Sequence, residues 1–274
     1  MSHNSIERIL VPVDLSETSL NALDTAVFLA KKYQAELQIL NVSEKIPGGR
    51  NIEGQATFSK KPYPDVLPAL QRAIGDTNGI KPGLLIKEGY VAETIISVAV
   101  STKSDLIVMG THGASGYRDG FIGSNCYTVI KHADCHVLIV PPAIRFTLSN
   151  NLLFPVRPVN GVLRQYKLVC NFMTEGSTLQ ILGLSNFSAE RETGALNKLA
   201  GEIKNELEKG NVKNRTVWGK GISASADILH FMQIHSPDLI VLSTFLDGIV
   251  KPNYIGPHTQ KIINTSRIPV LVIK

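Results

Sequence analysis

The sequence has few cysteines, no long apolar run and no large excess of charge, and each shortage excludes a class of protein. Its 274 residues include three cysteines, Cys126, Cys135 and Cys170, and no CxxC pair. This argues against a disulfide scaffold and against a structural zinc site. No uncharged stretch approaches the roughly 18 apolar residues that a membrane-spanning helix needs, and the N-terminal segment lacks the apolar core of a signal peptide. We therefore expect a cytoplasmic protein without membrane association.

The charge balance is mildly basic. Lys and Arg number 28 against 23 Asp and Glu, which gives a formal net charge of +5. The basic residues are scattered in pairs such as Lys31-Lys32 and Lys60-Lys61, a pattern that favours a solvated surface over a nucleic-acid groove. Hydrophobic residues make up 43% and charged residues 19% of the chain, a composition that excludes wholesale disorder.

Several catalytic motifs are also missing. The chain has no GxxxxGK[ST] loop, which excludes P-loop machinery, and no GxSxG nucleophile elbow. The Rossmann GxGxxG pattern is absent after the first apolar run, where the sequence reads Asp14–Thr18. No histidine stands in a context typical of a triad base, so we assign no catalytic residue.

One group of metal-ligating residue types requires a closer look. His132, Cys135 and His136 lie near one another in sequence, and Cys126 is a turn or two upstream. However, Cys135 falls in the turn before a strand that His136 begins, and successive strand side chains point to opposite faces. Because spacing alone is weak evidence for ligation, we predict no metal site.

An internal repeat organises the chain, which at roughly 150 residues per domain is long enough for two domains. Four apolar segments recur in the same order at spacings of 143, 142, 133 and 133 residues. The pairs are Arg8–Val13 with Asn151–Val156, Leu37–Leu40 with Leu179–Leu182, Asp105–Val108 with Asp238–Val241, and Val137–Val140 with Val270–Ile273. The fall in spacing assigns nine additional residues to the first copy, within the Pro/Gly-rich stretch Ile46–Pro68. We predict a tandem duplication with domains at 1–143 and 150–274, joined near Pro141–Ser149.

Each copy alternates short runs rich in Val, Ile and Leu with stretches of helical periodicity. The short runs are typical of strands buried on both faces of a parallel sheet, and in Ser19–Tyr33 apolar residues recur at spacings of three and four. Ala189–Lys209 of the second copy reads as a long helix that ends at Gly210. The predicted strands of the first copy are Arg8–Val13, Glu36–Val42, Leu84–Glu88, Asp105–Met109 and His136–Val140, with helices at Ser19–Tyr33, Ala92–Val100 and Ser124–His132. This alternation predicts a doubly wound α/β fold in each copy.

Ligands of such sheets bind beyond the carboxyl ends of the strands, so the residues that follow the strands form the candidate site. Asp14 follows the first strand, where a carboxylate can accept from a ribose hydroxyl or an adenine amine. The glycine-rich segment Gly110–Ser124 follows the fourth strand in the pattern G-x2-G-x9-G-[ST]. Glycines let the backbone approach a phosphate, and a helix beginning here offers free N–H groups to an anion. The Ser124 hydroxyl either caps that helix or donates to a phosphate.

These motifs resemble the universal stress protein family in its tandem two-domain form, and the resemblance covers essentially the whole chain. Its most specific parts are Ile9–Ser16, Asp105–Ser124 and Ala133–Pro141. The resemblance implies a five-stranded parallel sheet with helices on both sides in each domain. In the nucleotide-binding branch of the family the glycine-rich loop holds ATP, which makes ATP, alone or with Mg²⁺, the expected ligand, with ADP and AMP as alternatives.

The resemblance also implies a role for individual residues. Pro12, Val13 and Asp14 would contact the base and ribose, and Val42 would face adenine. Met109, Gly110, His112 and Gly113 would wrap the ribose and phosphates, and Gly123, Ser124 and Asn125 would hold the phosphates. From the residues alone, His112 is equally well read as a solvated loop residue.

The second copy departs from this pattern at every informative position. Arg157 stands where the first copy has Asp14, and Ser243 and Leu246 replace Gly110 and Gly113. Gly256-Pro257 replaces Gly123-Ser124, which removes both an N–H donor and a hydroxyl. We predict that the second copy does not bind ATP in this way. Arg157 is then a surface or interface residue or binds another anion.

Three functions remain open from the sequence. The first is a stress-response regulator that binds ATP in the first copy, with the second copy as a scaffold or built-in dimer partner. The second is a nucleotide-free interaction module with an unidentified protein partner, and the third is a very slow ATPase. The apolar last strands, Val137–Val140 and Val270–Ile273, predict that the two copies pair edge to edge, antiparallel, within one chain. This leaves a further homodimer open.

Overall fold

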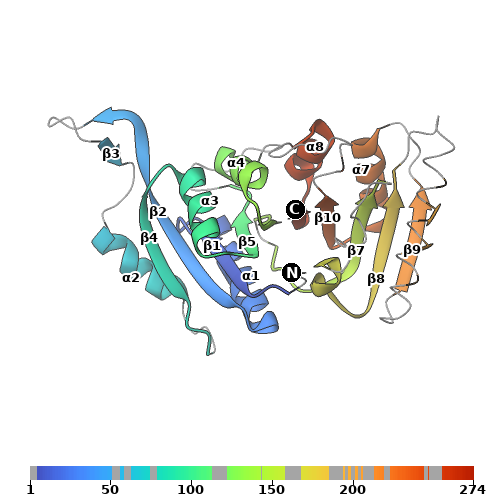
Figure 1. Ribbon diagram of the computed structural model, residues 1–274, viewed down its shortest axis with the longest axis horizontal. Coiled ribbons are helices and arrows are strands. Elements are labelled where there is room, and N and C mark those ends of the chain that lie inside the picture. Colours follow the sequence, from blue (N-terminus) through green and yellow to red (C-terminus); the bar gives the residue numbers. More distant parts are fainter. Residues whose placement is uncertain are drawn as a thin grey trace. The chain divides into compact units, whose positions relative to one another are not determined.

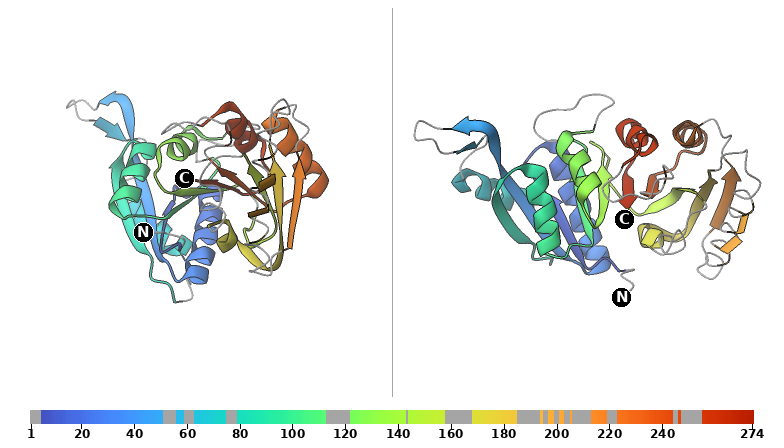
Figure 2. Two further views of the ribbon diagram at one scale, coloured as in Figure 1. Left: turned by 45° about the vertical axis from the view of Figure 1, so that its right-hand side comes forward. Right: turned by 45° about the horizontal axis from the view of Figure 1, so that its top comes forward.

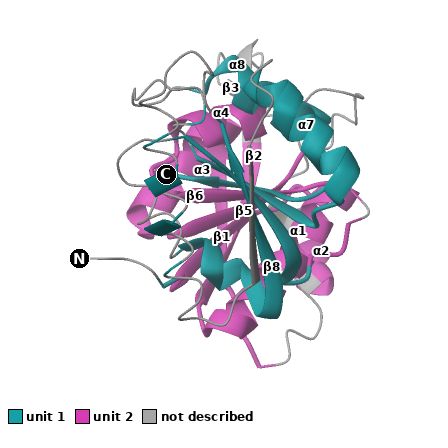
Figure 3. Ribbon diagram, turned by 90° about the vertical axis from the view of Figure 1, so that its right-hand side faces the viewer, with its two compact units in different colours: residues 1–5, 147–274 teal, residues 6–146 magenta. Residues whose placement is uncertain are grey.

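The computed structural model (Figure 1) divides into two compact units, residues 6–146 and residues 1–5 with 147–274, and each is described by itself (Figure 3). The chain passes from one unit to the other between Phe146 and Thr147. The structure describes residues 5–50, 56–58, 63–74, 79–112, 122–142, 144–157, 168–184, 194, 197–198, 201–202, 205, 213–218, 223–243, 246 and 255–274.

The first unit is built on a parallel sheet in the order β4-β2-β1-β5-β6. The central strands are buried on both faces because their residues are almost all apolar; Ile9, Leu10 and Val11 of β1 are completely buried. The strands are β1 (Arg8–Pro12), β2 (Glu36–Arg50), β4 (Gly83–Gly89), β5 (Leu106–Gly110) and β6 (His136–Val140), with β3 (Ala56–Phe58) beside β2. The helices are α1 (Glu17–Tyr33), α2 (Tyr63–Ile74), α3 (Val91–Ser101) and α4 (Ser124–His132).

Helices cover both faces of this sheet, as a doubly wound fold requires. In Figure 2, α1 lies on one face, and α3 and α4 pack against each other on the opposite face. Helix α1 begins where the Ser16 hydroxyl accepts from the Ser19 N–H, and it ends at Gln34, which takes the left-handed conformation. The strand order reverses between β1 and β5, so their carboxyl ends form the crevice in which such sheets bind ligands.

The segment after the predicted second strand differs from expectation. That strand was expected to end at Val42, but β2 continues to Arg50 and its distal part pairs antiparallel with β3. The extra length falls in the stretch Ile46–Pro68, to which the repeat spacing assigned nine additional residues. Its Pro and Gly residues gave no strand signal because a protruding ribbon does not need a buried apolar face.

The second unit repeats the order of the first, β9-β8-β7-β10-β11, and every adjacent pair is parallel. The structure therefore confirms the predicted α/β fold with a five-stranded parallel sheet in each copy. The helix expected over Ala189–Lys209 falls mostly outside the described residues. The strands are β7 (Ser149–Val156), β8 (Met173–Gly183), β9 (Lys213–Trp218), β10 (Leu239–Ser243) and β11 (Val270–Ile273). Its described helices include η1 (Cys170–Phe172), α7 (Ala224–His235) and α8 (Pro257–Thr265), and residues 194, 197–198, 201–202 and 205 are helical as well.

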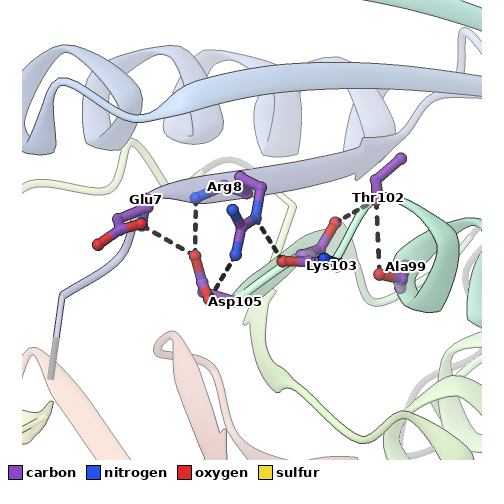
Figure 4. A network of polar contacts seen from close by, with 7 residues as sticks. Glu7, Arg8, Ala99, Thr102, Lys103 and Asp105 are labelled. Atoms are coloured by element: carbon purple, nitrogen blue, oxygen red, sulfur yellow. Dashed lines mark hydrogen bonds and ion pairs between the residues drawn. The ribbon is translucent and has the colours of Figure 1, made fainter. Parts of the chain in front are cut away.

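The two units also share a polar device at the amino ends of their central strands. In the first unit the Asp105 carboxylate accepts from the backbone N–H of Glu7 at 2.9 Å and of Arg8 at 2.8 Å, as Figure 4 shows. In the second unit Asp238 accepts from the N–H of Asn150 at 2.9 Å and of Asn151 at 3.2 Å. Each carboxylate satisfies two backbone donors that precede the first paired residues of the two strands, which are Ile9 with Leu106 and Leu152 with Leu239.

Candidate functional site

A cavity of about 340 Å³ lies at the carboxyl ends of β1, β2 and β5 in the first unit. Its wall also takes residues from the N-terminal turns of α1, α3 and α4. The lining residues are Pro12, Val13, Asp14, Ser19, Leu40, Val42, Val91, Ile95, Met109, Gly110, Thr111, His112, Gly123, Ser124, Asn125 and Cys126. The cavity thus occupies the switch point at which doubly wound sheets bind their ligands.

Ten of the eleven residues predicted to form a nucleotide site line this one cavity. The exception, Gly113, lies outside the described residues. The structure therefore brings together positions that are up to 113 residues apart, from Pro12 to Asn125. Whether they contact a nucleotide stays a prediction.

The sequence reading missed part of the wall. Leu40 stands two positions before Val42, so strand alternation places both on the same face and was a usable signal. Val91 and Ile95 are one helical turn apart on α3, and periodicity alone could not tell which face of that helix meets the sheet. The other missed lining residues are Ser19, Thr111 and Cys126.

Asp14 is held by a compact turn between β1 and α1. Its carboxylate oxygen Oδ1 accepts from the Ser16 N–H at 3.0 Å and also from the Ser16 hydroxyl. The Asp14 N–H donates to Ser19 Oγ at 3.2 Å, and that hydroxyl donates in turn to the Ser16 carbonyl at 2.9 Å. The turn therefore fixes the carboxylate at the edge of the cavity.

Two glycines of the loop motif lie close to other parts of the backbone. A Cβ on Gly110 would lie 2.8 Å from the carbonyl oxygen of Thr18, in the first turn of α1. A Cβ on Gly123 would lie 3.2 Å from the carbonyl oxygen of Thr111, to which the Gly123 N–H donates at 2.8 Å. The prediction attributes these glycines to phosphate approach alone, but close backbone packing is a second reason for Gly110, whereas a Cβ on Gly123 would need only a small shift of its neighbour.

His112 belongs to the cavity wall and is half-buried. Its Nδ1 lies 2.8 Å from the Thr111 hydroxyl, and its carbonyl accepts from the hydroxyl of Thr18. These contacts tie the end of β5 to the first turn of α1. Of the two readings of His112 left open by the sequence, the geometry favours a residue that faces the cavity.

The N-terminus of α4 forms the opposite side of the cavity. Gly123 is the N-cap and no side chain caps the helix, so of the two roles left open for the Ser124 hydroxyl the structure excludes the cap. Ser124 is instead the first helical residue, because the first helical bond runs from the Tyr127 N–H to the Gly123 carbonyl at 3.0 Å. The N–H groups of Ser124, Asn125 and Cys126 precede that bond and have no acceptor within the helix. Burial raises the pKa of the Cys126 thiol, which keeps the sulfur protonated at neutral pH.

The corresponding positions of the second unit are arranged differently. The Arg157 Nε donates to the carbonyl of Leu246 at 2.5 Å, and the Leu246 side chain is buried, with 2% exposure. Helix α8 begins with Gly256 as its N-cap and Pro257 at its first position. An internal hydrogen bond and an aliphatic side chain thus stand where the first unit has a carboxylate and a glycine.

Among the described residues no three or more His, Cys, Asp or Glu side chains come together as a metal-ligand group. In the same residues no helix is both long enough and apolar enough to cross a membrane.

Comparison with known proteins gives consistent matches. The model of the Universal stress protein family matches residues 5–141. The universal stress protein Sll1654 of Synechocystis sp. is 35% identical over 133 residues, which is 48% of this chain and 84% of that protein. The universal stress protein MJ0531 of Methanocaldococcus jannaschii is 33% identical over 142 residues, which is 50% of this chain and 83% of that protein.

Solved structures match over the full length. A universal stress protein from Archaeoglobus fulgidus is 21% identical with a TM-score of 0.68, and the match covers 100% of this chain and 98% of that one. A functionally unknown protein, PA1789 from Pseudomonas aeruginosa, is 15% identical with a TM-score of 0.67 over 99% of this chain and 93% of that one. At these identities the likeness concerns the fold, which includes both units.

Proposed function

The chain belongs to the universal stress protein family, and we propose that its first unit binds one adenine nucleotide, with ATP as the expected ligand. The observation that carries the proposal is the convergence of ten predicted nucleotide-site residues around one cavity. A volume of about 340 Å³ falls within the range of small-molecule pockets. The protein is then a nucleotide-dependent regulator of a stress response, and its second unit is a scaffold or a built-in partner.

The distribution of residue types around the cavity supports a base at one side and phosphates at the other. Toward β2 and α3 the wall is apolar, with Leu40, Val42, Val91 and Ile95, which suits the faces of an adenine ring. Toward β5 and α4 it carries polar groups. These are Thr111, His112, Ser124 and Asn125, together with the uncapped N-terminus of α4, which favours an anion.

The residues that line the cavity also support nucleotide binding without hydrolysis. Asp14 is the one carboxylate among the described lining residues, and its Oδ1 accepts two hydrogen bonds from Ser16. A water-activating base for phosphoryl transfer would have to be His112, whose Nδ1 contacts Thr111. We therefore expect hydrolysis to be negligible or very slow. Several turnovers per second, abolished in His112→Ala, would contradict this.

Equilibrium binding tests the proposal. Calorimetry with ATP, ADP and AMP, each with and without Mg²⁺, should give one site per chain, and GTP serves as the control for base recognition. Nucleotide released by denaturing freshly purified protein should be adenine nucleotide. The proposal fails if none of the three adenine nucleotides binds, and the single-site assignment fails if two equivalent sites appear.

A further inference from the structure

One residue beside the cavity holds a backbone conformation that its side chain disfavours. Four described non-glycine residues have a positive φ: Leu15, Gln34, Lys103 and Ser236. Gln34 and Ser236 are the C-caps of α1 and α7, and Lys103 follows the C-cap of α3. Left-handed residues are ordinary at such helix ends. Leu15, with a φ of 65°, instead lies between β1 and the N-terminus of α1.

A branched aliphatic side chain has no local hydrogen bond with which to offset this conformation. Asn and Asp tolerate the left-handed region because their side chains bond nearby backbone groups, and Gly has no Cβ to clash. Leu has neither advantage. Strained residues of this kind persist where the surrounding structure fixes them, and they concentrate at functional sites.

The consequence of the left-handed turn is visible in the contacts on either side of Leu15. The chain reverses so that both the N–H and the hydroxyl of Ser16 reach Oδ1 of Asp14. The Ser16 hydroxyl also lies 3.2 Å from the hydroxyl of Thr18, which donates to the carbonyl of His112. Each hydroxyl donates its one hydrogen, Ser16 to Asp14 and Thr18 to His112, so these are two separate hydrogen bonds that lie side by side at the carboxyl ends of β1 and β5.

We propose that Leu15 is a positioning residue for ligand binding, which acts by holding the Asp14 carboxylate in its place at the cavity. This inference rests on the proposed nucleotide function. Leu15 does not line the cavity, so its effect on affinity passes through Asp14. What matters at position 15 is the ability to adopt a positive φ, while the size or apolarity of the side chain is secondary.

Substitutions that differ in backbone preference test this role. Leu15→Asn and Leu15→Gly tolerate the left-handed conformation and should bind ATP within about threefold of the parent. Leu15→Val resists it because of its branched Cβ and should bind at least about tenfold more weakly. The matched control is Gln34→Val, which disfavours the left-handed C-cap of α1 at the far end of the helix. It should lower the unfolding midpoint without changing the affinity of the folded protein.

A double-mutant cycle separates positioning from a general loss of structure. If Leu15 acts through Asp14, Leu15→Val should weaken ATP binding strongly in the parent and by less than about twofold in an Asp14→Ala background. Equal losses in both backgrounds, or equal affinities for Leu15→Val and Leu15→Asn, would overturn the proposal. If the parent itself binds no adenine nucleotide, the proposed function fails first. If the parent binds ATP but the effects of the two substitutions are additive, the positioning role of Leu15 is wrong and the proposed nucleotide function still stands.

Discussion

At the scale of single residues, backbone packing alone excludes a side chain at Gly110. Gly110 passes so close to α1 that a methyl group would overlap the carbonyl of Thr18. Ser243 occupies the equivalent position of the second unit. The glycine at position 110 therefore has two consequences. It permits the close contact between β5 and α1, and it leaves the cavity wall without a side chain at this position.

Gly110→Ala should lower the free energy of unfolding by about 1–3 kcal/mol, the usual cost of overpacking. The physical reason is the 2.8 Å approach of the new Cβ to backbone atoms that cannot rotate away. Urea denaturation measures the change. Gly201→Ala is the control, because a Cβ there meets nothing within 4 Å and the residue is helical. A Gly110→Ala variant as stable as Gly201→Ala would show that α1 moves aside freely.

Asp14→Ala should weaken ATP binding by about 1.5–3 kcal/mol, the contribution of a hydrogen bond to a charged group. Asp14→Asn keeps an oxygen that can accept from the Ser16 N–H, so it preserves the turn while it removes the charge. We expect calorimetry to show weaker binding for both variants, and denaturation to show the smaller stability loss for Asn. Parent-like affinity in both would make Asp14 a turn residue only.

At the scale of elements, the amino ends of the central strands are joined by one carboxylate in each unit. Asp105 accepts from the backbone N–H groups of Glu7 and Arg8 where β1 begins, and Asp238 accepts from two at the start of β7. The ion pair of Asp105 with Arg8, at 3.9 Å and partly exposed, adds little to this. The repeated segment Asp105–Val108, which recurs as Asp238–Val241, thus supplies a strand and, through its aspartate, a link to the neighbouring strand.

Asp105→Ala and Asp238→Ala should each reduce the free energy of unfolding by about 1–3 kcal/mol, because each leaves two backbone donors without a protein acceptor. Asp134→Ala, at an exposed turn position, is the control and should stay within about 0.5 kcal/mol of the parent. Urea titration of the three variants makes the comparison. If all three behave alike, solvent replaces the carboxylate without cost.

Elements with a buried apolar signature could be predicted from the sequence, and elements without one could not. Ser124–His132 and His136–Val140 match α4 and β6 in full, since both bury apolar residues in a regular pattern. The continuation of β2 to Arg50 and its partner β3 have no such pattern. For the cavity, residues after strand ends were predictable because chain order alone places them at the sheet's edge. The contribution of α3 depends on helix rotation, which the sequence leaves undetermined.

At the scale of the whole molecule, the duplication has produced two units of one topology with different chemistry at equivalent places. The first unit keeps Asp14 beside a cavity, whereas the second joins Arg157 to the carbonyl of Leu246. Under the proposed function, one binding unit is tethered to a similar but altered one, which suits a regulator whose second half supplies a surface and no second site. Each unit ends in an apolar strand, β6 or β11, that has one parallel neighbour within its own sheet.

The outer edges of those last strands should pair with each other, and amide hydrogen exchange tests this without any substitution. The His136 N–H donates toward β5, so strand alternation directs the N–H groups of Val137 and Ile139 away from it. The Pro269 carbonyl accepts from the Ile240 N–H of β10, so residue 269 directs its backbone groups toward β10. Alternation then directs the N–H groups of Val270 and Val272 away from β10. If the edges pair within the chain, these four amides should be protected to within about tenfold of inward amides such as that of Leu138, at every protein concentration. Protection that disappears on dilution would assign the cover to a second chain. Rapid exchange of the outer amides beside slow inner ones would mean that neither edge is covered.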